Sequence, residues 1–173
     1  MNISMHSASA PVFLRTLNGM LTWLDKAQAH AEVRKFDANN YLTSRLAPDM
    51  LPFTRQIQIT TDGVKACMAR LAGQEVPKWE DNEATLDDLR ARINKTLAFV
   101  ASFTPAQING SEMREIVLPM RTGDPKRFDG ESFLKHYALP NFFFHATTTY
   151  ALLLWKSVKL ALVVTTLSVL VGF

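Results

Sequence analysis

The chain has 173 residues, 47% of them hydrophobic, and 19 Lys and Arg against 16 Asp and Glu give a net charge of +3. This length suits one domain with a hydrophobic core, and the composition excludes collagen-like, disulfide-stapled and intrinsically disordered proteins. Basic and acidic residues are interleaved, without the basic stripe that a nucleic-acid interface needs, so we expect no nucleic-acid partner.

The expected compartment follows from the N-terminal segment and the cysteine count. The first ten residues, MNISMHSASA, lack the basic run and apolar stretch of a secretory signal. The single cysteine, Cys67, allows no internal disulfide bond and lies in an apolar helical stripe, so we predict a buried structural thiol. Both features predict a cytoplasmic protein.

Two amphipathic helices are predicted in the first half of the chain, because apolar residues recur there every three or four positions. The first runs from about residue 9 to residue 35, with Pro11 in its first turn, where the missing amide costs no hydrogen bond. An irregular linker follows over residues 37–52. The second helix then starts near Pro52 or Phe53 and is ended by Gly73.

A third helix and a small hairpin are predicted next. Thr85 and Asp88 form a capping box that opens the third helix, which ends at Thr104. Apolar alternation over residues 114–120, a glycine-containing turn and a second short segment at 126–128 predict a β-hairpin.

The fourth predicted helix runs from about residue 131 to residue 155, and Pro140 is expected to kink or restart it. The run Phe142–Phe144 covers most of the helix circumference, so we expect it to be buried almost all round, in the core or partly against another subunit. The pattern as a whole predicts an all-α protein, a four-helix bundle over residues 1–159 with a small β-hairpin between helices 3 and 4.

The C-terminal extension, residues 160–173, is apolar at 10 of its 14 positions and contains no charged residue. As a helix it would span about 21 Å, short of the roughly 30 Å of a bilayer core, so a membrane anchor is disfavoured. Six of its residues are Val or Thr, which permits a strand as well as a helix. We expect this extension to pack on the bundle or on a partner subunit.

One group of polar residues predicts a ligand pocket between the helices. His145 shares a helix face with Asn141 and with Thr149, each four residues away, amid apolar positions. Asp49 and Gln56 flank the start of the second helix and could face His145. Convergent polar groups between apolar walls are typical of small-molecule sites. His145 itself could be a hydrogen-bonded pocket residue, a core residue or a metal ligand.

The histidines give no complete metal site. A bundle metal site commonly takes two ligands three or four residues apart on one helix. His136 and His145 are nine apart, which places them on opposite faces of an ideal helix. No cofactor is therefore predicted from the spacing, although a divalent metal, Zn or Ni, is possible with other ligands.

Three segments carry a family resemblance: RLAPDMLPFTRQIQI (45–59), EVPKWED (75–81) and LPNFFFH (139–145). Together they resemble an uncharacterised bacterial family of the DinB/YfiT-like superfamily, over roughly residues 1–155. The resemblance implies an up-down-down-up four-helix bundle that is often dimeric. It also implies relatedness to metalloenzymes and thiol-dependent transferases with a three-histidine site, one histidine from the second helix and two from an HxxxH on the fourth.

The chain departs from that metal pattern. Its predicted second helix contains no histidine, and the fourth carries NxxxH, so only His145 matches. The leading hypothesis is a DinB-like protein that binds a small molecule in an inter-helix pocket without a complete three-histidine site. The alternatives are a metal-dependent transferase or hydrolase, which leaves open whether the chain is an enzyme, and a structural homodimerisation module.

Overall fold

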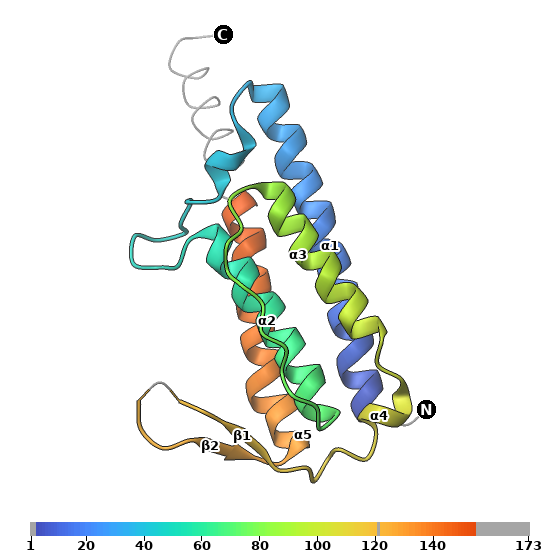
Figure 1. Cartoon of the computed structure of the whole chain (residues 1–173). Coiled ribbons are helices and arrows are strands. Elements are labelled where there is room, and N and C mark those ends of the chain that lie inside the picture. The colour runs from blue at the N-terminus through green and yellow to red at the C-terminus, as the bar shows by residue number, and fades with distance from the viewer. Residues whose placement is uncertain (1–2, 121, 155–173) are drawn as a thin grey trace, which may run out of the picture.

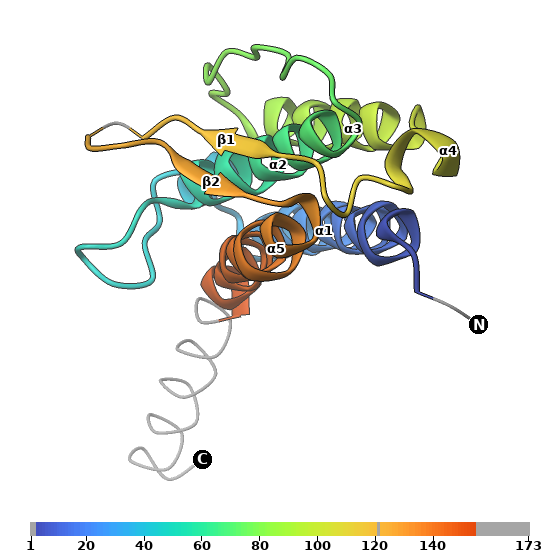
Figure 2. The same cartoon turned by 90° about the horizontal axis from the view of Figure 1, so that it is seen from below.

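A computed structural model describes residues 3–120 and 122–154 of the chain, so the predicted packing of residues 160–173 lies outside the described residues. The described chain is mostly helical, with one small antiparallel hairpin (Figure 1). Three long helices and a long C-terminal helical stretch lie side by side in both views (Figures 1 and 2).

The first helix, α1, covers Met5–Arg34 and begins earlier than predicted. Ser4 caps it, because the Ser4 hydroxyl accepts from the Ser7 amide while the Ser7 hydroxyl accepts from the Ser4 amide. Pro11 therefore lies inside the helix, in its second turn, and the first-turn prediction is wrong. Its ring is exposed, which lets the helix continue past the lost hydrogen bond.

The next two long helices begin where they are predicted to begin. After the short 3₁₀ turn η1 (Ala38–Tyr41), α2 covers Phe53–Leu71, and Gly73 follows it with a φ of +70°, as predicted for a glycine that ends a helix. Helix α3 covers Leu86–Ala101 and is opened by the predicted Thr85–Asp88 capping box.

Helix α3 ends three residues before Thr104, and Thr104 instead caps a separate short helix, α4 (Pro105–Ile108). The predicted hairpin is confirmed: β1 (Ile116–Leu118) pairs antiparallel with β2 (Lys126–Phe128). In both views the hairpin lies on the side of α2 and the C-terminal helix (Figures 1 and 2).

The C-terminal helix runs over residues 130–154 and continues through Pro140 without a break. It comprises α5 (Gly130–Phe133), the π-helical turn η2 (Leu134–Ala138) and helical residues 139–154. A proline ring crowds the carbonyl four residues before it, and a wider π turn just upstream relieves that crowding. The predicted restart is thus wrong, and a kink at Pro140 stays a prediction.

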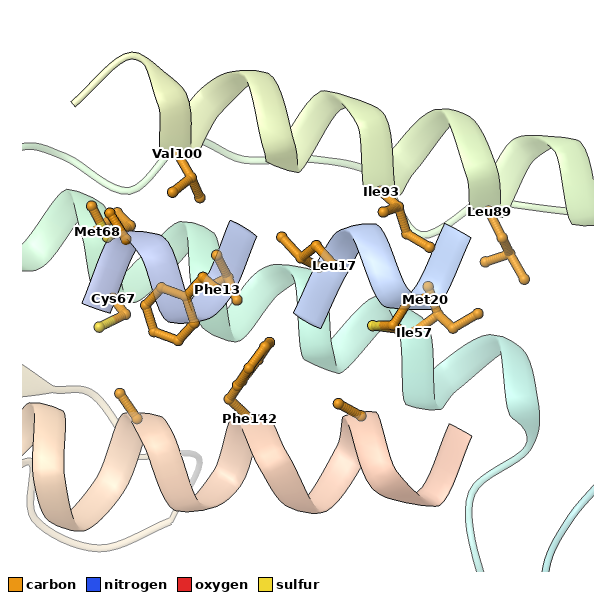
Figure 3. Packing of buried hydrophobic residues seen from close by; sticks show 14 of the residues in the cluster. Phe13, Leu17, Met20, Ile57, Cys67, Met68, Leu89, Ile93, Val100 and Phe142 are labelled. Atoms are coloured by element: carbon orange, nitrogen blue, oxygen red, sulfur yellow. The ribbon is translucent and has the colours of Figure 1, made fainter. Parts of the chain in front are cut away.

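The core lies between the long helices, each of which contributes an apolar stripe (Figure 3). Phe13 of α1 and Phe142 of the C-terminal helix meet edge to face, with ring centroids 4.9 Å apart. Phe143 and Phe144, in contrast, are 42% and 56% exposed. The expectation of burial all round is therefore wrong within this chain, and contact with another subunit stays a prediction.

Candidate functional site

The structure joins two of the predicted site residues, His145 and Gln56. The Nδ1 atom of His145 lies 2.7 Å from Oε1 of Gln56, and the two residues are only 9% and 1% exposed. The Gln56 Nε2 group donates to the carbonyl oxygen of Leu51 at 3.0 Å, which orients Oε1 as the acceptor. Nδ1 of His145 must therefore carry the hydrogen that Gln56 accepts.

This hydrogen bond determines the chemistry left to His145. Burial lowers the pKa of the imidazole, which favours its neutral form. In the neutral ring with a proton on Nδ1, the Nε2 atom carries a lone pair and can accept a hydrogen bond or a proton. The ring of Phe144 lies edge-on to the imidazole, with centroids 5.0 Å apart.

The other predicted site residues lie in different surroundings. The Thr149 hydroxyl is buried and donates to the carbonyl of His145 at 2.9 Å, one turn back in its own helix. Asp49 is exposed in the loop before α2. Asn141 is half-buried and borders a cleft. The structure thus brings Gln56 to His145, whereas a shared pocket that includes Asp49 and Thr149 stays a prediction.

The cleft beside Asn141 lies between α2 and the C-terminal helix, and β1 with Pro119 closes its outer side. Its volume is about 280 Å³, slightly below the usual range for small-molecule pockets. We call it the α2 cleft. It is lined by Ile59, Asp62, Gly63, Ala66, Arg70, Leu118, Pro119, Phe133, Tyr137, Ala138 and Asn141.

Gly63 forms part of the cleft wall. A glycine in a helix interior costs about 1 kcal/mol relative to alanine, and here it stands in the middle of α2. A Cβ atom built on Gly63 would meet no atom within 4 Å, so packing against the protein does not require the glycine. The missing side chain keeps the cleft open.

Two charged residues border the α2 cleft, and their partners differ. The Asp62 carboxylate pairs with Lys65 at 2.7 Å and with Arg92 at 2.9 Å. Among the described residues, the Arg70 guanidinium has neither a hydrogen bond nor an ion pair. The positive charge of Arg70 is therefore available to a ligand.

A buried ion cluster centred on Arg92 fixes the segment before α3. Besides Asp62, the Arg92 guanidinium pairs with Asp81 at 2.9 Å and Glu83 at 2.7 Å. The ammonium groups of Lys65 and Lys95 both lie over the Trp79 ring, 4.6 Å and 4.5 Å from its centroid. Sequence reasoning missed both this cluster and Arg70. The signal for Arg70 was its spacing of seven residues from Gly63, which puts both on one face of α2.

The residues do not fit the three-histidine metal site that the superfamily implies. The α2 residue that meets His145 is an amide, and neutral amide oxygens are weak ligands for Zn or Ni. Within residues 3–120 and 122–154, no three His, Cys, Asp or Glu side chains are grouped so as to hold a metal ion.

Three comparisons place the chain among known proteins. The model of a family described as a domain of unknown function, DUF1993, matches residues 5–162. The crystal structure of a DinB family member from Shewanella denitrificans matches with a TM-score of 0.78 and 34% sequence identity, over 87% of this chain and 85% of that one. No curated protein matches significantly. In the part of the chain that the structure describes, no helix is long and apolar enough to cross a membrane.

Proposed function

This chain belongs to the DUF1993 family of DinB-like proteins, and from that premise we propose that it binds a small molecule in the α2 cleft. The observation that carries the proposal is the cleft itself, a cavity of about 280 Å³ with a helix-interior glycine on its wall. The His145–Gln56 hydrogen bond ties the same two helices together next to it. Asn141, one turn from His145, supplies an amide to the cleft.

The proposal includes the up-down-down-up bundle topology. It is supported by Figure 1, in which α1 and the C-terminal helix run in one direction and α2 and α3 in the other. We also propose a cytoplasmic location, which the free, buried Cys67 supports, since unpaired structural thiols persist in reducing compartments.

Substitutions at Gly63 test the cleft. Naphthamide, a neutral aromatic probe, is titrated against the unmodified chain and its variants by ligand-detected NMR. Gly63→Ala adds a methyl group to the cavity and is expected to weaken binding, and Gly63→Leu is expected to abolish it.

Gly19→Ala is the matched control, because Gly19 is also inside a long helix and a Cβ there makes only ordinary contact with Trp23. Both alanine variants gain the same helix propensity, up to about 1 kcal/mol. If the Gly63 variants bind naphthamide as tightly as the Gly19 variant does, the cleft is not a ligand site.

A second candidate function, a homodimerisation module, is favoured by one face of the C-terminal helix. Phe143, Tyr150 and Leu154 follow one another at seven- and four-residue steps and so share a helix face, and Phe144 adjoins it. All four are between 42% and 56% exposed, which is a large apolar exposure for one helix face.

Sedimentation velocity tests this second function. We expect the unmodified chain to sediment as a dimer and the Phe143→Ser/Phe144→Ser variant as a monomer. Val33→Ser is the control, because Val33 is an exposed apolar residue of α1. A monomeric unmodified chain would remove this candidate.

A further inference from the structure

We propose that the ligand of the α2 cleft carries an oxyanion, a carboxylate or a phosphate, which Arg70 binds, on a small apolar body. This inference rests on the proposed function and adds the chemical class of the ligand. It follows from the charges at the cleft, from the groups beside Arg70 and from the length of the wall that α2 contributes.

The charge balance of the cleft leaves one positive group for a ligand. Asp62 and Arg70 are the charged residues among those that line the cleft. Lys65 and Arg92 already neutralise the Asp62 carboxylate. Arg70 has no such partner in the described chain, so an oxyanion entering the cleft meets an uncompensated guanidinium.

The electrostatic partners of Arg70 are the Cys67 thiol and the Tyr137 hydroxyl, and neither is a carboxylate. Burial raises the pKa of the Cys67 thiol to about 12, so it stays protonated. Burial also lowers the pKa of Arg70 itself, as expected for a cation without a carboxylate beside it, although a guanidinium remains charged. A partly desolvated arginine binds carboxylate or phosphate through two parallel hydrogen bonds, and water screens this pairing less than it would at the surface.

The shape of the cleft defines the rest of the ligand. Gly63 and Arg70 are two helical turns apart, about 10 Å along the axis of α2. Between them the walls are mainly apolar, from Ala66, Leu118 and Ala138. A ligand with its oxyanion at Arg70 would therefore place an apolar body of one or two rings toward the open space at Gly63.

Naphthoate and naphthamide, which differ only in charge and in one polar group, test this inference. Isothermal titration on the unmodified chain should show naphthoate binding at least about tenfold more tightly than naphthamide, with the difference shrinking as salt is added. Arg70→Met should lower the affinity for naphthoate to that for naphthamide, which itself should not change. Arg70→Lys should restore part of the preference, because it keeps the charge and loses the paired hydrogen bonds.

Naphthyl phosphate is compared with naphthoate to distinguish a phosphate from a carboxylate ligand. The compound that binds more tightly indicates which of the two groups the natural ligand carries. Thermal unfolding of each variant shows whether it is folded, and the comparison of naphthoate with naphthamide on the unmodified chain needs no variant at all. If naphthamide binds in a Gly63-dependent way but naphthoate is not preferred, the oxyanion inference fails and the proposed function stands. If neither compound binds, the proposed function fails with it.

Discussion

The hydrogen bond between His145 and Gln56 can be weighed by a double-mutant cycle. Gln56→Leu removes the acceptor and leaves the Nδ1 hydrogen of a buried imidazole without a partner. An orphaned buried polar group costs about 1–3 kcal/mol, so we expect the single variant to lose about that much stability. For a domain of this size, each kcal/mol lowers the melting temperature by about 2–4 °C, which gives a loss of about 2–12 °C.

The double variant separates this bond from the other contacts of Gln56. Gln56 also holds the Leu51 carbonyl, but that contact is lost in both the single and the double variant and cancels from the coupling energy. In Gln56→Leu/His145→Leu neither polar group remains, so part of the loss should be recovered. We expect a coupling energy of about 1 kcal/mol or more from urea unfolding.

A coupling energy below about 0.5 kcal/mol would refute the reasoning, because distant residues already show deviations of that size. Such a result would mean that the two side chains do not share a buried hydrogen bond. It would also remove the argument that the proton of the neutral imidazole lies on Nδ1.

Three further predictions concern pH, packing and thiol reactivity. Since burial lowers the pKa of His145 in the folded state, the unfolded chain takes up a proton first as the pH falls below about 6.5, and stability should drop by at most about 1.4 kcal/mol per pH unit in urea unfolding. Phe142→Ala should cost about 3–5 kcal/mol in the same assay, because Phe142 is fully buried against Phe13. Cys67 should react with a thiol reagent only as fast as the protein opens, since it is buried and its pKa is raised to about 12.

Each of these has its own control. The pH effect should be absent from His145→Leu, and an unchanged pH dependence in that variant would assign the effect to other groups. Phe143→Ala, one residue along, should cost less than about 1 kcal/mol because Phe143 is 42% exposed, and equal losses in the two variants would contradict the packing. Rapid labelling of Cys67 in the folded chain, at a rate insensitive to urea, would show an accessible thiol.

Local signals in the sequence predict most of the secondary structure. The Thr85–Asp88 capping box, the glycine after α2 and the alternation at the hairpin each act within a few residues of the element they define. Pro11 and Pro140 were predicted less well. At Pro11 an upstream serine cap shifted the helix start, and at Pro140 a π turn relieved the steric clash.

The candidate site, too, could be predicted from the sequence only in part. The spacing of Asn141 and His145 placed both on one helix face, and the structure keeps them beside α2. The contact of His145 with Gln56, and not with Asp49, depends on how α2 packs against the C-terminal helix. The two residues in contact are 89 positions apart, so no local pattern in the sequence predicts their contact. The exposure of Phe143 and Phe144 also depends on tertiary packing. Helical periodicity gives the angle between successive side chains, but it does not tell on which sides of the helix the neighbouring helices pack.

The sequence by itself determined the helical class, most element boundaries, the buried thiol and the absence of a histidine on the second helix, because these depend on residue type and on short-range geometry. Only the tertiary structure decided which polar groups find partners. The Asp62 carboxylate is neutralised by a residue of α3, whereas Arg70, two turns further along α2, has no partner in the described chain. Pairing of charges depends on long-range packing, and that packing leaves Arg70 unpaired at the cleft.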